Sequence, residues 1–510
     1  MKDEITSMME EEVFEVTDLS TALRTQKVSD VLSSKWVFAK KTAPIRYKAH
    51  LVARGFRQTR GINFEETFAP TPTFGALRLL LSMAISNDWA IKTFDVKVAF
   101  LHSLIDMPVF IWPPQGMMID RGKVLKLKKA LYGTKQAARC WWKHLTNILQ
   151  NIGFQPNKED LSTYTFHFDM GSAILWIHVD DGAIACSSKD LLLMICHCLN
   201  EKLKIKWDNK ISGLVGLEIA QHPKGILISQ PDLIRKLVNL SPSNITAKSP
   251  LPHNCNLVSN KAAHMDIPYL KRIGMLLYIA QGSRPDITYA VNYLARFSLG
   301  TDPSHWEALE HLIAYLRYTL NIGIYIGNEH PENKIECYVD ANWGGEGNRS
   351  SHGFILFHNK NPIAWQSKRQ ATVASSTCQA EYMALSFASK ECLWMTNLFH
   401  PILAIPTPII YSDNKTSIDI ALDIANRKQT RHLIREFNLI NEYICTKKVI
   451  LSWVSTDNQM ADILTKALGS IKVKEFLSKL IGDTCLDKCY GGECYDSPKN
   501  QKKTLEHSKT

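Results

Sequence analysis

The stretch AILWIHVDDGAIAC, from Ala173 to Cys186, places two adjacent aspartates between two apolar runs typical of buried β-strands. Together with the Asp-Gly pair, these runs predict a β-hairpin. In one interpretation Asp181 and Gly182 supply the positive-φ residues of the turn, which explains only one of the aspartates. Neighbouring side chains of a regular strand point to opposite faces, so Asp180 and Asp181 can share a ligand only where the chain bends. A hairpin tip provides that bend, and a pair of Mg²⁺ ions would be a suitable ligand.

Length and composition restrict the class of protein. The chain has 510 residues, a length that predicts about three or four domains. Its net charge of +11 favours a polyanionic partner, and its 12 scattered cysteines indicate reduced thiols. The acidic N-terminus does not resemble a signal peptide, and no apolar run reaches the ~18 residues that span a bilayer. We therefore expect a soluble, intracellular protein without a membrane partner.

Composition and periodicity divide the chain into five segments. They are an N-terminal lead-in at 1–34, a first domain at 35–240, a linker with following helices at 241–333, an alternating strand and helix region at 334–468, and a polar C-terminal tail at 469–510.

Four local patterns within these segments can be compared with a structure. Residues 241–264 are rich in Ser, Pro and Asn, which is typical of a linker. Ser304 and Glu307 have the spacing of a capping box at the start of a helix. In the alternating region we expect a long helix over 376–399 and a last helix over 458–468.

A third acid belongs with the double aspartate. Asp95, in TFDVKVAF, stands at the end of an apolar strand upstream of the hairpin. Transfer of a nucleotide needs two divalent ions about 3.5–4 Å apart, and hard Mg²⁺ ions are held by carboxylates from different strands. Asp95, Asp180 and Asp181 could therefore form a metal site for nucleotidyl transfer.

The motifs around these acids resemble a known family. TFDVKVAFLH, LKKALYGTKQAARCWWKHL and IHVDDGAIA are similar to successive polymerase motifs of copia-type LTR retrotransposon Pol polyproteins, in the reverse transcriptase and ribonuclease H region. RYKAHLVARGFRQTRGINFEETFAPTPTFGALRLLLSMA resembles the fingers segment that precedes them. The resemblance extends from about residue 35 to 467, in the family's order.

The resemblance implies roles for eight residues of the first domain. Asp95 and Asp180 would be the principal metal ligands and Asp181 the third acid, Phe100 the gate against ribonucleotides, Gln136 a nucleotide contact, Lys48 and Arg54 triphosphate contacts, and His178 a neighbour of the primer terminus. Alternatives stay open for three of these: Phe100 could be a core residue, and Lys48 and Arg54 could belong to a solvated basic face. The sequence departs from the family's usual residues at His178, His50, Thr134 and Ala138.

A second set of acids lies in the alternating region, which resembles a ribonuclease H domain. The matching residues are Asp340 in CYVDANW, Glu381 in SSTCQAEYMAL, Asp413 in YSDNKTS and Asp462 in NQMADILTK. We expect Asp340 within a central strand, Glu381 in the first turns of the long helix, Asp413 after the fourth strand and Asp462 at the start of the last helix. Taken singly, each acid could instead be a helix cap or a surface group. Together they imply a nuclease that uses two metal ions.

The resemblance also implies a fold, cofactors and partners. The fold would be α+β and multidomain, with a right-hand polymerase of fingers, palm and thumb-connection followed by an α/β ribonuclease H-like domain with a mixed sheet. Each active site would hold two Mg²⁺ ions, or Mn²⁺ in their place. The partners would be an RNA template, a DNA primer, an RNA–DNA hybrid and deoxynucleoside triphosphates, with self-association or contacts to other element-encoded proteins. We expect a location in the cytoplasm, within retrotransposon particles, or in the nucleus.

Two alternatives and three weaker signals remain. A degenerate or co-opted copy would fold and bind nucleic acid without polymerase activity, and a further variant would retain only the nuclease. Cys485, Cys489 and Cys494 suggest zinc, although their spacing fits no common zinc module. His432 is as consistent with a structural role as with a functional one. Trp141 and Trp142 have helical apolar spacing, which favours core packing over base stacking for at least one of them.

Overall fold

The computed structural model describes residues 1–42, 45–208, 211, 213–253, 255–258, 265, 267–328, 332–344, 349–400, 402–422 and 434–481. They form two compact units. Unit 1 comprises 1–72, 93–184 and 189–208; unit 2 comprises 73–92, 185–188 and the described part of 209–510.

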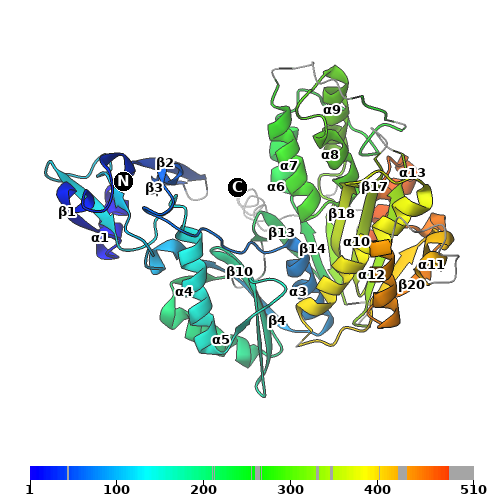
Figure 1. Cartoon of the computed structure of the whole chain (residues 1–510), viewed down its shortest axis with the longest axis horizontal. Coiled ribbons are helices and arrows are strands. Elements are labelled where there is room, and N and C mark those ends of the chain that lie inside the picture. The colour runs from blue at the N-terminus through cyan, green and yellow to red at the C-terminus, as the bar shows by residue number, and fades with distance from the viewer. Residues whose placement is uncertain are drawn as a thin grey trace, which may run out of the picture. The chain divides into compact units, whose positions relative to one another are not determined.

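Unit 1 is built around a six-stranded sheet with the order β11-β4-β10-β9-β8-β7 (Figure 1). Its strands are β4 (Ala90–Val96), β7 (Gln155–Pro156), β8 (Thr163–Phe168), β9 (Gly171–His178), β10 (Asp181–Cys186) and β11 (Ile205–Trp207). The accompanying helices are α4 (Ala137–Ile152) and α5 (Lys189–Lys202). Helix α4 is amphipathic, and it buries Trp141, Leu145 and Leu149. Trp141 is thus a core residue, as its spacing suggests.

The rest of unit 1 holds a three-stranded sheet, β1-β6-β5, and a two-stranded hairpin, β2-β3. The elements are α1 (Lys2–Glu10), β1 (Phe14–Asp18), α2 (Leu19–Ala22), β2 (Ser34–Thr42), β3 (Ile45–Ala53), β5 (Phe110–Ile111) and β6 (Lys123–Leu127). Met8, Leu51 and Leu125 share one buried cluster there. Because β1 pairs with β6 along its whole length, the expected lead-in is an integral part of this unit.

Helix α3 (Phe74–Ser86) belongs to unit 2, although its residues lie within the first expected domain, 35–240. It packs on strands β15 (Ile324–Gly327) and β18 (Asn361–Arg369). The buried guanidinium of Arg78 donates to the carbonyl oxygens of Ile363, Gln281 and Gly282 at 2.7, 2.8 and 2.9 Å. It also lies 3.9 Å from the centre of the Trp365 ring. These contacts fix α3 to unit 2.

Unit 2 contains a five-stranded mixed sheet with the order β18-β17-β16-β19-β20. Its further strands are β16 (Ile335–Asn342), β17 (Ser351–His358), β19 (Ile409–Ser412) and β20 (Ile450–Trp453). β19 runs parallel to β16 and β20, and the other pairs are antiparallel. Helix α10 (Thr377–Leu398) lies across the sheet against β16, with α11 (Lys415–Ala421) and α12 (Ile434–Cys445) beside it (Figure 1). This is the mixed sheet with packed helices that the resemblance implies.

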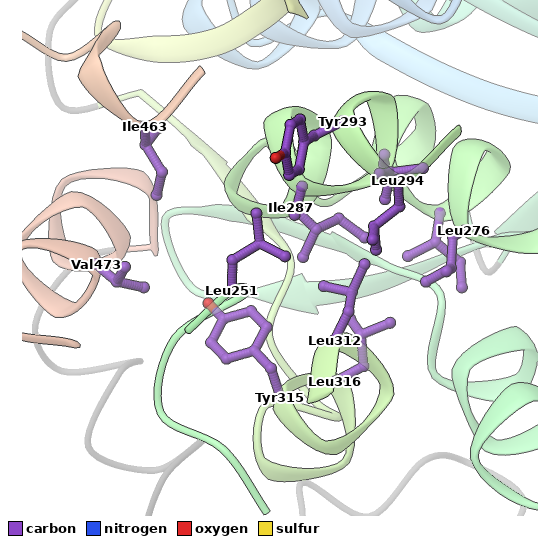
Figure 2. Packing of buried hydrophobic residues seen from close by; sticks show 14 of the residues in the cluster. Leu251, Leu276, Ile287, Tyr293, Leu294, Leu312, Tyr315, Leu316, Ile463 and Val473 are labelled. Atoms are coloured by element: carbon purple, nitrogen blue, oxygen red, sulfur yellow. The ribbon is translucent and has the colours of Figure 1, made fainter. Parts of the chain in front are cut away.

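The large core of unit 2 lies between helices. They are α6 (Pro231–Val238), α7 (Tyr269–Gly282), α8 (Thr288–Ala295), α9 (Pro303–Tyr318) and α13 (Ser470–Ile481), next to a four-stranded sheet of β12 (Gly213–Leu214), β13 (Leu217–His222), β14 (Gly225–Ser229) and β15. Figure 2 shows Leu276, Ile287, Leu294 and Leu312 converging in this core.

Two segments expected to be outside the core are part of it. Leu251, in the expected linker, is 2 % exposed and lies beside Ile287 and Tyr315 (Figure 2). Val473, in the expected polar tail, is buried in the same cluster because 470–481 is an amphipathic helix. The tail prediction is wrong for these residues.

The predictions for His432 and for Cys485, Cys489 and Cys494 fall outside the described residues. Within the described part of the chain, no helix combines the length and apolar character needed to cross a membrane.

Candidate active sites

The turn between β9 and β10 carries the double aspartate. Its two residues are Val179 and Asp180, and Asp181 and Gly182 already belong to β10. Val179 has φ 60°, a conformation that is unfavourable for a β-branched residue. Trp141 Nε1 donates to the carbonyl oxygen of Val179 at 2.7 Å, which holds the turn from the side of α4. The interpretation of Asp181 and Gly182 as the turn residues is therefore wrong.

Strand β4 brings Asp95 to this turn. The backbone N–H of Val96 donates to the backbone oxygen of Asp180 at 2.7 Å. Burial raises the pKa of Asp180, and the charge of Asp95 raises it further. Burial also raises the pKa of Asp181, with added contributions from Asp180 and Asp95. The three acids thus influence one another electrostatically.

A cavity of about 610 Å³ adjoins these acids within unit 1. Its lining includes Asp95, Asp180 and Tyr132, together with Glu4 of α1 and His50 of β3. His50 Nδ1 lies 3.3 Å from Glu4 Oε1, so one departure from the family's usual residues pairs with the N-terminal helix.

Phe100 contacts Tyr132, which lines the cavity together with Asp95 and Asp180. It lies in a 3-10 turn, Ala99–His102, and its ring centre is 4.6 Å from that of Tyr132 in an edge-to-face contact. Burial raises the pKa of Tyr132 to about 12, and Asp180 and Asp95 add to the shift. Phe100 also packs against Ala137 and its buried neighbours.

The other residues expected to contact the nucleotide or the primer differ in their burial. Gln136 is fully buried: its Oε1 accepts from Gln58 Nε2 and its Nε2 donates to the Asn63 oxygen, both at 2.9 Å. Both polar atoms of its amide are thus held in buried hydrogen bonds. Arg54 is exposed, and His178 is half-buried beside the Trp176 ring, 6.4 Å between centres.

Lys48 lies in β3, opposite Ala39 of β2, which places its backbone in the β2-β3 hairpin.

The second set of acids forms a tighter cluster in unit 2. Asp340 comes from β16, Glu381 from the first turns of α10 and Asp413 from the residue after β19. One oxygen from each lies within 4.8 Å of the other two, the one such group of three found among the described residues. The acids of unit 1 do not form a group this tight.

Electrostatics make this cluster receptive to a cation. Glu381 is 7 % exposed, and its Oε2 has no hydrogen-bond partner. Burial raises the pKa of Glu381, and the charges of Asp340 and Asp413 raise it further. The pKa of Asp340 is also raised by burial, against the opposing effect of Lys466. A buried, unpaired carboxylate oxygen beside two further acids is a donor set suited to a hard divalent cation.

Asp462 joins the cluster from a 3-10 turn, Asp462–Leu464, rather than from the expected last helix. The electrostatic contribution of Asp462 raises the pKa of Asp340. The next helix, α13, begins only at Ser470 because an irregular segment intervenes.

Three residues that sequence reasoning missed support this cluster. The hydroxyl of Thr465 donates to Asp340 Oδ2, and that of Thr456 donates to Asp413 Oδ2 at 2.9 Å. Lys466 Nζ lies 2.9 Å from Asp462 Oδ1. The spacing of Asp462 and Lys466, four residues apart, is a sequence signal that could have indicated the pair.

Comparisons with known proteins show which proteins the chain resembles. Residues 13–251 match the family model described as reverse transcriptase (RNA-dependent DNA polymerase). The chain is 30% identical over 466 residues to the Retrovirus-related Pol polyprotein from transposon RE1 of Arabidopsis thaliana, covering 88% of this chain and 32% of that protein. It is 29% identical over 504 residues to the corresponding polyprotein from transposon TNT 1-94 of Nicotiana tabacum, covering 94% of this chain and 37% of that protein.

Among solved structures, the chain resembles a foamy viral protease-reverse transcriptase dRH in complex with ds DNA. The TM-score is 0.51 at 13% identity, over 89% of this chain and 70% of that one. The fold is therefore similar to that of a reverse transcriptase. Over most of its length the chain is therefore similar to retrovirus-related Pol polyproteins of transposons, and its residues 13–251 match the reverse transcriptase family. It spans about a third of the length of the curated relatives named above.

Proposed function

We propose that this chain copies RNA into DNA at the unit 1 acids and degrades the RNA strand of the resulting hybrid at the unit 2 acids. The gathering of Asp340, Glu381 and Asp413 within 4.8 Å is the observation that carries the proposal. Acids that are distant in sequence and costly to bury together need a function that uses their charge.

At the polymerase site, Asp95, Asp180 and Asp181 would hold the divalent ions, which we propose to be two Mg²⁺. When bound, such ions lower the charge on the attacking and leaving oxygens of the nucleotide. Asp95 lies on β4, Asp181 on β10 and Asp180 in the turn before β10, where the hydrogen bond from the Val96 N–H to the Asp180 backbone oxygen keeps their spacing. At the nuclease site, the divalent ions would be held by Asp340, Glu381, Asp413 and Asp462.

The proposed partners are an RNA template, a DNA primer, the hybrid between them and deoxynucleoside triphosphates. The net charge of +11 supports nucleic-acid binding, because phosphate contacts supply most of such affinity. A resembling reverse transcriptase has been solved with ds DNA. The roles of Phe100, Gln136, Lys48, Arg54 and His178, and the location in particles or the nucleus, stay predictions.

Primer extension tests the polymerase. The purified chain should extend a DNA primer on an RNA template when Mg²⁺ is present. Asp180→Asn should lower the rate by about a hundredfold or more, since a neutral amide holds a divalent ion weakly. Asp208→Asn is the matched control: this acid lies near Asp181 and accepts from Thr93 Oγ1 at 3.1 Å, outside the proposed ligand set. Equal extension by wild type and Asp180→Asn would contradict the proposal.

A nuclease-only chain is the second candidate. It is favoured by the looser arrangement of Asp95, Asp180 and Asp181 compared with the unit 2 acids. Hybrid cleavage without any primer extension, under conditions where a known reverse transcriptase extends the same primer, would select this candidate.

A further inference from the structure

A cation of the chain itself lies within the unit 2 cluster. Lys466 Nζ is 2.9 Å from Asp462 Oδ1 and 3.9 Å from Asp340 Oδ2. In the part of the chain that the structure describes, no other lysine or arginine forms an ion pair with any of the four acids. The lysine therefore touches one side of the cluster only.

The backbone fixes this position. The N–H of Lys466 donates to the backbone oxygen of Asp462 at 3.1 Å, which sets the two side chains one turn apart. The neighbouring Thr465 is fully buried and donates to Asp340. The Lys466 side chain is still 38 % exposed, so its ammonium group has a path to solvent.

The other side of the cluster carries no such partner. Glu381 Oε2 is buried without a hydrogen bond, and Asp413 is bonded through Oδ2 to the neutral hydroxyl of Thr456. Carboxylates held this close repel one another strongly where water is excluded. Lys466 offsets that repulsion most directly for Asp340 and Asp462, with which it forms ion pairs, whereas Glu381 Oε2 has no hydrogen-bond partner.

We propose that Lys466 is the internal counter-ion of this cluster, which holds Asp340 and Asp462 in place and is displaced from Asp340 when a divalent cation binds. The inference rests on the proposed nuclease site and adds a regulation of its metal affinity. Lys466 is a positioning residue, not a metal ligand. Because ammonium and metal compete for the same oxygens, each weakens the binding of the other. The lysine thus makes occupancy of the site depend on the free Mg²⁺ concentration.

The experiment is a Mg²⁺ titration of the full chain, followed by melting temperature and by isothermal titration calorimetry. Lys466→Met should half-saturate at about tenfold lower Mg²⁺ than wild type, because no ammonium has to be displaced. Without Mg²⁺, it should melt below wild type, since the acids lose their counter-ion. Lys466→Arg retains the charge and should melt and bind Mg²⁺ much as wild type does.

Two controls make the outcome specific. Lys472→Met removes an exposed cation that acts on Asp462 only through its field, and should change Mg²⁺ half-saturation by less than about twofold. Asp340→Asn removes a proposed ligand, so the Mg²⁺ response that remains in this variant comes from other sites on the chain.

Two results would contradict the account, and each points to a different failure. If Lys466→Met binds Mg²⁺ no more tightly than Lys472→Met or Lys466→Arg, the counter-ion role is overturned while the metal site stands. If wild type and Asp340→Asn respond equally to Mg²⁺, the metal site fails, and the proposed nuclease function fails with it.

Discussion

Gly182 shows how a single residue at the first site depends on a distant contact. A Cβ at this position would lie 2.2 Å from the Phe94 ring, which belongs to the neighbouring strand β4. The glycine is therefore required by close packing beside Asp95, not by a positive φ. The positive φ of Val179 strains the turn, and two hydrogen bonds offset this strain: the Val179 oxygen accepts from Trp141 Nε1, and the Asp180 oxygen accepts from the Val96 N–H of β4.

Gly182→Ala should destabilise unit 1 by about 1–3 kcal/mol, because the Phe94 ring must move to admit the methyl group. Thermal or urea unfolding of the variant measures this. Gly274→Ala is the control: it lies in helix α7 with nothing within 4 Å of the added Cβ, so it should be neutral or stabilising by about 0.5–1 kcal/mol. A stable Gly182→Ala variant would mean that Phe94 does not pack as described.

At the residue scale, the sequence predicts where the acids stand but not what surrounds them. Asp340 within β16 and Asp413 after β19 follow from apolar runs that end in a carboxylate. The contacts of Thr465 and Lys466 with Asp340 join segments more than a hundred residues apart, so no local pattern reveals these contacts. For Gln136, the sequence predicts a nucleotide contact, but its amide forms hydrogen bonds with two residues more than seventy positions away.

Helix α9 shows that the sequence can predict an element without predicting the contacts at its end. The pattern of Ser304 and Glu307 predicts the helix but the wrong cap. The helix begins at Pro303, with Asp302 as its N-cap: Asp302 accepts from the Ser304 and His305 N–H groups at 2.9 and 3.3 Å. A proline in the first turn and an acid just before it are the more specific start signal.

Asp302→Ala should therefore lower the melting temperature of the protein by a few degrees, because two N–H groups lose their acceptor. Ser304→Ala should change the melting temperature much less. The two variants measured side by side distinguish the caps, and a larger loss from Ser304→Ala would favour the cap predicted from sequence alone.

Packing at the whole-molecule scale joins segments that the sequence assigns to different domains. Helix α3 is fixed to unit 2 by Arg78 and also by a buried polar network around His358. His358 Nδ1 lies 2.8 Å from Ser82 Oγ, and its Nε2 lies 3.1 Å from Asn333 Oδ1. The division between the units could not be predicted, because helix periodicity does not say which sheet a helix covers.

His358 should make unit 2 sensitive to acid. Burial lowers its pKa to about 4 from an ordinary value of 6.5. Between these two values the unfolded chain takes up a proton that the folded chain refuses, so the free energy of unfolding should fall as the pH drops from about 6.5 to about 4. The loss from this group is up to about 3 kcal/mol.

Unfolding measured across this pH range in wild type and His358→Gln checks the prediction. The variant is expected to be less stable at pH 7 but to lose less on acidification, whereas His400→Gln, at an exposed position, should follow wild type. An unchanged pH slope in His358→Gln would contradict the role of the buried ring.

Hybrid cleavage by Glu381→Gln tests most directly whether the gathered acids of unit 2 form a metal-dependent nuclease. Glu391→Gln, on the same helix α10 and outside the acid cluster, is the matched control. With Mg²⁺, wild type and Glu391→Gln should cleave the RNA strand of an RNA–DNA hybrid at similar rates, and Glu381→Gln should be slower by about a hundredfold or more. Cleavage by Glu381→Gln at the wild-type rate, or cleavage that persists after chelation of divalent ions, would contradict the central claim.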